Sequence, residues 1–187
     1  TGAMKVGNLV PWQTRYSYLK KFGIGSMPGT GFPGESAGLL NSTTVWENDR
    51  IKRYVSNFGQ GISVSPIQSA MMYQAVANQG VRLQPQLIEG CVDATGKTTK
   101  VTKDKAPVRV VSAASAKSTL DILEKVVEEG GIGKTAAVPG YRVGGKTGTA
   151  QIADPNTGRY GNLFAISFIG VAPIDDPQFV VAVTAYK

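Results

Sequence analysis

The sequence predicts an α+β fold, in which an antiparallel sheet is flanked by helices. Stretches with helical spacing of apolar residues precede three extended, largely apolar segments at 141–152, 163–172 and 178–186. The segments are joined by the short connections "ADPNTGRYGN" and "PIDDP". Because short connections favour antiparallel neighbours, the three segments should form one meander against which the helices pack.

The bulk composition indicates one globular unit that spans residues 1–187. Hydrophobic residues make up 42% and charged residues 18% of the chain, which provides material for a buried core and too little charge for disorder. The glycines and prolines lie in short clusters between apolar runs, so we expect many tight turns. The sequence shows no signal peptide and no apolar run of membrane-spanning length.

The first predicted helix covers residues 11–21, which read "PWQTRYSYLKK". A proline suits its first turn, lysines suit its last turn, and Gly23 follows as a stop signal. The next stretch, 22–36, is too rich in glycine and proline for a helix or a central strand. We therefore expect it to form an ordered loop.

A second helix should begin at Pro66, capped by Ser65, and end before Gly80. Close burial is expected for one mostly apolar stripe of this helix, which consists of Ile67, Ala70, Met71, Gln74 and Ala77.

Residues 81–111 should form short strands and turns, and residues 112–129 a third helix that ends at Gly130. The apolar face of this helix consists of Leu120, Leu123, Val126 and Val127. The turn region before it contains a basic stretch that should be a solvated hairpin and that consists of Lys97, Lys100, Lys103, Lys105 and Arg109. The formal net charge is +7, but the other basic residues are scattered, so the sequence does not predict nucleic-acid binding.

Histidine is absent from the sequence. This absence removes the Ser-His-Asp and Cys-His catalytic devices and the histidine-based zinc site. The single cysteine, Cys91, excludes an internal disulfide and a thiolate metal cluster, and we expect it to be a small packing residue near a strand. Catalysis would have to use lysine, carboxylate, hydroxyl or backbone groups, and the sequence predicts neither a metal nor a cofactor.

The stretch "GYRVGGKTGTAQ" fits the phosphate-loop pattern G-x-x-x-x-G-K-[ST] from Gly140 to Thr147. A phosphate loop follows a buried strand and opens a helix, whose free amides hold the phosphates. Here "AAVPG" precedes the pattern, and Gly148, Thr149 and Pro155 oppose a helix after it. A nucleotide site is therefore not the favoured interpretation.

If residues 141–152 form a strand instead, their side chains indicate a different kind of site. Alternation would place Thr147 and Thr149 on one face and Lys146 on the other. Both hydroxyls could bond one carboxylate, and the unpaired amides of an edge strand could stabilise an oxyanion. The glycines at 144, 145 and 148 would let a substrate backbone approach closely. A glycine-rich strand merely packed against a helix is the less favoured alternative.

Lys146-Thr147-Gly148 resembles the K-T-G element of the serine acyl-enzyme family of penicillin-binding proteins and β-lactamases. Nearly the whole chain resembles the later part of a class B penicillin-binding protein transpeptidase domain of the cell-division type. The stretches that carry this resemblance occur in the family's order and are "FGIGSMPGTGFPGES", "FGQGISVSPIQSAMMYQAVANQGV", "GGKTGTAQ" and "FIGVAPIDDPQFVVAV". The resemblance implies a helix-flanked antiparallel sheet with the K-T-G strand at the edge of the active-site cleft.

The resemblance also implies a reaction, peptidoglycan D,D-transpeptidation. A serine attacks the D-Ala-D-Ala peptide of a stem, D-alanine leaves, and an amine of a neighbouring stem resolves the acyl-enzyme; β-lactams acylate the same serine. By this resemblance, Lys146 supplies positive charge and helps proton movement, while Thr147 and Thr149 bind the terminal carboxylate. The backbone amide of Thr149 would be an oxyanion donor, Gly148 would belong to the substrate-binding strand, and Tyr160 would wall the cleft.

Two other family elements, S-x-x-K with the nucleophile and a serine-x-asparagine triplet, are missing at the matching positions. Ser17-Tyr18-Leu19-Lys20 satisfies S-x-x-K in letters, but it lies before "FGIG", which in the family follows both elements. We therefore expect both elements to precede Thr1 and a closing helix to follow Tyr186. Residues 1–187 would then be the C-terminal portion of a transpeptidase domain that cannot acylate alone.

Two further hypotheses stay open: a serine β-lactamase, which shares the K-T-G strand, and a non-catalytic sensor or scaffold module. The long "FGQGISVSPIQSAMMYQAVANQG" stretch favours the transpeptidase over the β-lactamase. For the transpeptidase, the resemblance implies peptidoglycan stem peptides, β-lactams and division-machinery membrane proteins as partners. It also implies an anchor outside this segment and a place on the extracytoplasmic face of the cell membrane.

Overall fold

The α+β prediction is confirmed by the computed structural model, which describes residues 2–101, 105–154 and 156–187. The helices are α1 (Gly2–Gly7), α2 (Trp12–Lys21), α3 (Thr43–Asn48), α4 (Arg50–Val55), α5 (Pro66–Ala77) and α6 (Ala113–Val127), with 3₁₀ turns η1 (Ser56–Phe58) and η2 (Lys134–Ala136). The strands are β1 (Val81–Arg82), β2 (Gly90–Val92), β3 (Thr98–Lys100), β4 (Val108–Arg109), β5 (Gly144–Ala153), β6 (Tyr160–Ala172) and β7 (Phe179–Tyr186). No helix in the described part of the chain is both long and apolar enough to cross a membrane.

The last three strands form the antiparallel meander that the sequence predicts. Their order is β5-β6-β7, so β5 is an edge strand among the described residues. β5 and β6 pair from Gly144 with Val171 to Ala153 with Tyr160, and an irregularity after Gln151 shifts the register. β6 begins at Tyr160, three residues earlier than predicted, because the pairing continues past this irregularity.

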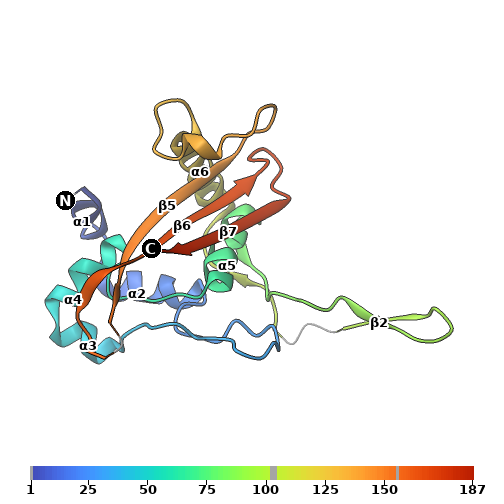
Figure 1. Cartoon of the computed structure of the whole chain (residues 1–187), viewed down its shortest axis with the longest axis horizontal. Coiled ribbons are helices and arrows are strands. Elements are labelled where there is room, and N and C mark those ends of the chain that lie inside the picture. The colour runs from blue at the N-terminus through green and yellow to red at the C-terminus, as the bar shows by residue number, and fades with distance from the viewer. Residues whose placement is uncertain (1, 102–104, 155) are drawn as a thin grey trace.

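Helices α5 and α6 cover one face of this sheet (Figure 1). Leu120 of α6, Val171 of β6 and Ile174 are buried together, and the half-buried residues packed on them are Tyr73, Val76, Ala77 and Val180. Gly144 and Val180 lie opposite Val171 in register, and opposite residues share a face. The other face therefore carries the alternate residues of each strand.

The third helix has the predicted apolar face. Leu120, Leu123 and Val127 are buried, while Val126 is half-buried. Ser112 caps the helix, since its hydroxyl accepts a hydrogen bond from the Ser115 amide at 3.1 Å. The sequence pattern was sufficient here because one side of α6 packs on the sheet while the other side meets solvent.

The predicted stripe of α5 is wrong in part. The buried positions are Gln68, Met71 and Ala75, of which the stripe contained Met71 alone. A buried glutamine breaks the apolar pattern because its polar atoms are paired: Nε2 donates to the carbonyls of Gly23, Ser26 and Ala37 at 3.2, 3.0 and 3.0 Å. Its Oε1 accepts from the Ser65 amide at 2.9 Å, which completes a capping box at the start of the helix.

The 22–36 segment is the ordered loop that the sequence predicts. Besides the bonds from Gln68, the carboxylate of Glu35 accepts hydrogen bonds from the Gly29 amide and from the amide and hydroxyl of Thr30. The Thr30 hydroxyl, more than the amides, holds the pKa of Glu35 below its usual range. The loop is thus tied internally by a carboxylate and to α5 by a carboxamide.

Helices α1, α3 and α4 lie in segments for which the sequence analysis predicts no element. Each is six residues long, too short for a periodic pattern to register. Trp46 of α3 is 1% exposed and packs against the rings of Trp12 and Tyr16, with centroids 6.3 and 5.3 Å away. This aromatic cluster joins α3 to α2.

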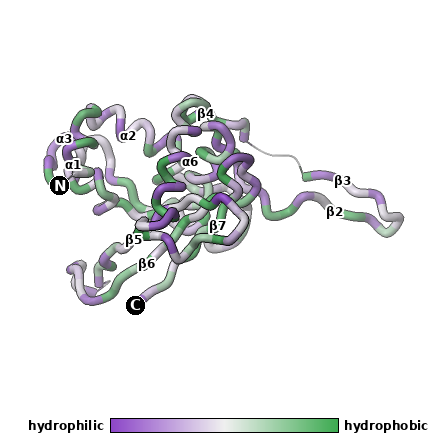
Figure 2. Tube along the Cα trace, turned by 90° about the horizontal axis from the view of Figure 1, so that it is seen from above, coloured by the Kyte–Doolittle hydropathy of each residue, from purple (hydrophilic) through white to green (hydrophobic). Residues whose placement is uncertain are grey.

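Strands β2 and β3 form a hairpin that projects from the body of the molecule (Figure 1, Figure 2). Lys97 and Lys100 are exposed on it, which confirms the solvated-hairpin prediction for these two residues. Lys105 and Arg109 are exposed outside the hairpin, and Lys103 lies outside the described residues. Cys91 is on β2 as expected but is exposed, so the prediction that it packs is wrong: the projecting hairpin offers nothing to pack against.

Replacing Gln68 with alanine should destabilise the protein strongly. Three loop carbonyls and the Ser65 amide would lose their partner in a site closed to water, which predicts a loss of about 2 to 3 kcal/mol in the free energy of unfolding. Denaturant unfolding measures the change. Gln13→Ala, on the exposed side of α2, is the matched control and should stay within about 0.5 kcal/mol of the wild type; equal losses in both variants would contradict the role given to Gln68.

Candidate active site

The hydrogen-bond phase of β6 determines which backbone groups of the neighbouring strand are free. Phe164 donates to the Lys187 carbonyl at 2.8 Å and accepts from the Lys187 amide at 3.0 Å, so both its backbone groups point toward the β7 side. Successive residues of an antiparallel strand point their backbone groups to opposite sides. Ile166 and Phe168 therefore also bond to β7, and the residues between them bond to β5.

Thr147 and Thr149 consequently have backbone groups that do not bond to β6. They lie opposite Phe168 and Ile166, whose amides and carbonyls are turned to β7. Gly148 lies opposite Ser167 and is bonded to β6 instead. The amides and carbonyls of both threonines thus point to the open edge of the sheet, where a ligand backbone or an oxyanion could bond to them.

Lys146 is brought to the same edge by its long side chain. In register it lies opposite Ile169, on the face away from the two threonines, as alternation predicts. Its Nζ nevertheless turns back and donates to the Thr147 carbonyl at 2.9 Å and to the Thr147 hydroxyl at 3.3 Å. A positive charge, a hydroxyl and two free amides therefore gather at one end of the β5 edge.

Gly144 and Gly148 of β5 have a packing role inside the protein. A Cβ on Gly144 would lie 2.6 Å from Ile174 Cδ1 and 2.9 Å from the Glu124 amide nitrogen, and one on Gly148 would lie 2.6 Å from Ser167 Oγ. These glycines permit close packing within the protein, against α6 and β6. Packing against a helix, the less favoured alternative, thus accounts for Gly144.

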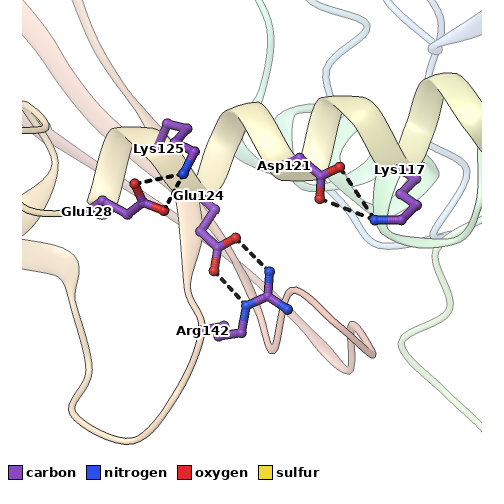
Figure 3. Close-up of polar contacts among 6 residues, drawn as sticks. All are labelled: Lys117, Asp121, Glu124, Lys125, Glu128 and Arg142. Carbon is purple, nitrogen blue, oxygen red and sulfur yellow. Dashed lines mark hydrogen bonds and ion pairs between the residues drawn. The ribbon is translucent and has the colours of Figure 1, made fainter.

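An ion pair holds the entry to β5 against α6. Arg142 Nε and one terminal nitrogen donate to the two Glu124 oxygens, both at 2.7 Å, as Figure 3 shows. The Arg142 bond holds the pKa of Glu124 below its usual range, and Glu124 raises the pKa of Arg142. The side chain of Glu124 is 16% exposed, so this pair is better shielded than the Lys117–Asp121 and Lys125–Glu128 pairs beside it.

A groove of about 560 Å³ runs beside the second half of β5. Gly148, Thr149 and Tyr160 line it, so three of the predicted site residues meet in one cavity. Lys146 and Thr147 lie next along the strand but outside this lining. Sequence reasoning missed the hydroxyl residues that also line the groove, which are Ser63, Ser69, Ser167, Thr184 and Tyr186. They come from separate elements, and no sequence motif connects them.

Residues 1–186 match the family model described as the penicillin binding protein transpeptidase domain. The chain is 38% identical to penicillin-binding protein PbpB of Mycobacterium tuberculosis over 97% of its length, and 34% identical to the probable peptidoglycan D,D-transpeptidase PenA of Neisseria flavescens over 98%. Its structure is similar to penicillin-binding protein 3 of M. tuberculosis complexed with aztreonam, with a TM-score of 0.91 and 38% identity over 98% of this chain.

The chain therefore belongs to the penicillin-binding protein transpeptidase family, in its class B branch. It spans 27% of the length of PbpB, 42% of PenA and 42% of the structurally similar chain. The fold and the family agree with the resemblance that the motifs carried.

Replacing Gly144 with alanine should destabilise the sheet. The new methyl group would meet backbone atoms of α6 that cannot rotate away, which predicts a loss of about 1 to 3 kcal/mol in the free energy of unfolding. Gly161→Ala, in β6 with open space around it, is the matched control and should cost little. An unchanged stability of Gly144→Ala in denaturant unfolding would contradict the packing described.

The Glu124–Arg142 pair should make stability depend on pH in acid. Because the folded-state pKa of Glu124 is lowered, its contribution is present above the unfolded value of about 4.3 and is lost as the pH falls through the folded pKa. The melting temperature of Glu124→Gln should lie below that of the wild type at pH 7 and converge with it below about pH 4. Glu47→Gln, an exposed control, should show no such convergence; a pH-independent gap for Glu124→Gln would rule out the ionic contribution.

Proposed function

We propose that this chain forms the K-T-G side of the active site of a peptidoglycan D,D-transpeptidase that works through a serine acyl-enzyme. The observation that carries the proposal is the open β5 edge, on which Lys146, the Thr147 hydroxyl and the free amides of Thr147 and Thr149 gather next to a groove. The family membership of residues 1–186 supports it.

The proposed chemistry assigns each group a task. The nucleophilic serine forms an ester with the penultimate D-alanine carbonyl, the peptide C–N bond breaks, and D-alanine leaves with the proton; the amine of a second stem then displaces the serine. The backbone amide of Thr149 donates a hydrogen bond to the tetrahedral oxyanion. A preorganised donor of this kind stabilises the transition state by about 3 kcal/mol. The Thr147 and Thr149 hydroxyls hold the terminal carboxylate, Tyr160 walls the groove, and the Lys146 charge assists proton transfer at the serine.

The nucleophile of this proposal lies outside the chain. Ser17 is exposed on α2, and Lys20 Nζ bonds to the Gly25 carbonyl at 3.2 Å and to Ser26 Oγ at 3.3 Å, not to Ser17. A serine whose lysine is engaged elsewhere has no activating base. We therefore keep the proposal that the S-x-x-K and serine-x-asparagine elements precede Thr1 in a longer transpeptidase domain.

The β7 part of the sheet face opposite α5 and α6 supports the proposal of a closing helix after β7. On β7, Phe179, Val181 and Val183 are 67%, 57% and 58% exposed and point to the face opposite α5 and α6. Three large apolar side chains in a row form a surface that a further amphipathic helix would bury.

The partners and location proposed for the intact protein follow from this function. Peptidoglycan stem peptides are the substrates, β-lactams are covalent inhibitors, and membrane proteins of the division machinery are the protein partners. The intact protein is anchored in the cell membrane with this domain on the extracytoplasmic face.

Two substitutions at the β5 edge should separate chemistry from recognition in the intact protein. Lys146→Ala should lower the rate of penicillin acylation by at least about a hundredfold, because it removes the charge that assists proton transfer. Thr147→Ala should mainly weaken binding, by about tenfold, because it removes one hydrogen bond to a carboxylate. Mass spectrometry of the penicillin adduct over time, at several penicillin concentrations, measures both effects.

Lys117→Ala is the control for this experiment, since Lys117 is exposed on α6 and outside the groove. Its acylation should match the wild type. Equal and small effects of Lys146→Ala and Thr147→Ala would refute the roles proposed. An adduct on Ser17 would refute the placement of the nucleophile, and rapid penicillin turnover by the intact protein would favour the β-lactamase hypothesis.

A further inference from the structure

Three arginines line one pocket. Helix α4, which carries two of them, lies at the end of the molecule opposite the β2–β3 hairpin (Figure 1). Arg15 comes from α2, and Arg50 and Arg53 come from α4. The pocket has a volume of about 320 Å³, and the aromatic rings of Trp12 and Tyr54 also line it. Nothing in the proposed transpeptidase chemistry uses these residues.

The pocket has no negative charge of its own. None of its lining residues is acidic. The acidic residue next to it in sequence, Asp49, is engaged elsewhere: its carboxylate accepts from the Lys52 amide at 3.1 Å and lies 3.7 Å from Lys52 Nζ. Within the described residues, none of the three arginines forms an ion pair. Three guanidinium groups without a counter-charge make this pocket strongly attractive to an anion.

The arginine side chains are held in place by contacts that leave most of their donors free. Arg50 Nε and a terminal nitrogen donate to the Tyr54 hydroxyl at 3.1 and 2.8 Å, and the Arg53 guanidinium lies 5.8 Å from the centre of the Trp12 ring. One terminal nitrogen of Arg15 donates to the Arg53 carbonyl at 3.2 Å. Such anchoring fixes the side chains before a ligand arrives, which reduces the entropy lost on binding.

Arg15 is the most buried cation of this arrangement whose donors are not all paired. Its Nε is buried and has no hydrogen-bond partner among the described residues, which is rare for a buried donor. Burial first, and the charge of Arg53 second, lower the pKa of the Arg15 guanidinium. An anion in the pocket would offset the repulsion between the Arg15 and Arg53 charges.

We propose that this pocket, lined by Arg15, Arg50 and Arg53, binds an oxyanion of the phosphate or carboxylate type. Planar guanidinium groups match the paired oxygens of both anions and bond them in a forked geometry that lysine cannot reproduce. This site is separate from the β5 edge, so it stands whether or not the transpeptidase proposal holds.

Isothermal titration calorimetry of the intact protein with sodium phosphate, and separately with sodium acetate, tests the proposal. Ionic strength is kept constant with chloride so that general screening does not imitate binding. We expect saturable binding of at least one anion. Whichever of phosphate and acetate binds more tightly shows whether the pocket prefers a phosphate or a carboxylate group. Arg50→Gln and Arg53→Gln should each weaken it by about tenfold, because each removes a charge-assisted contact.

Two further variants make the result specific. Arg53→Lys keeps the charge but loses the fork, so it should also weaken binding, by several-fold. Lys134→Gln removes one positive charge from an exposed position outside the pocket and should leave binding unchanged. The proposal is overturned if neither anion binds saturably, if the arginine variants bind as the wild type does, or if Lys134→Gln weakens binding as much as they do.

Discussion

The close approach of α6 to the start of β5 is the constraint on which the candidate site depends. At Gly144 the strand backbone and the α6 backbone leave no room for a methyl group, and the forked Glu124–Arg142 pair holds the same junction from the side. An edge strand normally exposes amides that invite pairing with another chain. Here β6 pairs with the inner edge of β5, and the start of β5 is held by helix α6 instead of by another strand on its outer edge. Its outer edge can therefore stay open without becoming loose.

The register of the sheet then determines which groups occupy that edge. With Gly144 opposite buried Val171, the amides of Thr147 and Thr149 point outward and that of Gly148 points inward. A shift by one residue would exchange these directions and move every side chain to the other face. It would also replace Gly144, where α6 leaves no room for a side chain, by a neighbour of the strand that faces the other way. The apolar core on the helix-covered face thus fixes the position of polar groups that it does not contact.

The sequence predicted the sheet and the helices α2, α5 and α6, because each has a periodic pattern or a clear stop signal. The edge position of β5 was implied by the family resemblance. The sequence misjudged the buried side of α5, since a glutamine whose four polar contacts come from separate segments is not recognisable in a local pattern. The same limit applies to the groove, whose hydroxyl residues lie on different elements, and to α1, α3 and α4, which are too short to show periodicity. Sequence alone also could not reveal that Lys146 turns back to Thr147, because that depends on the open space beside an edge strand.

Gln68 connects the β5 groove and the arginine pocket through its hydrogen bonds. It lies one turn into α5, whose first residues Pro66 and Ser69 line the groove beside β5. Its carboxamide also holds the loop that follows α2, the helix that carries Arg15 of the arginine pocket. Because that link consists of buried hydrogen bonds rather than a flexible chain, the arginine pocket and the β5 edge are held at a fixed separation. An anion bound in the pocket would therefore contact residues of helices α2 and α4, which keep their position relative to the β5 edge.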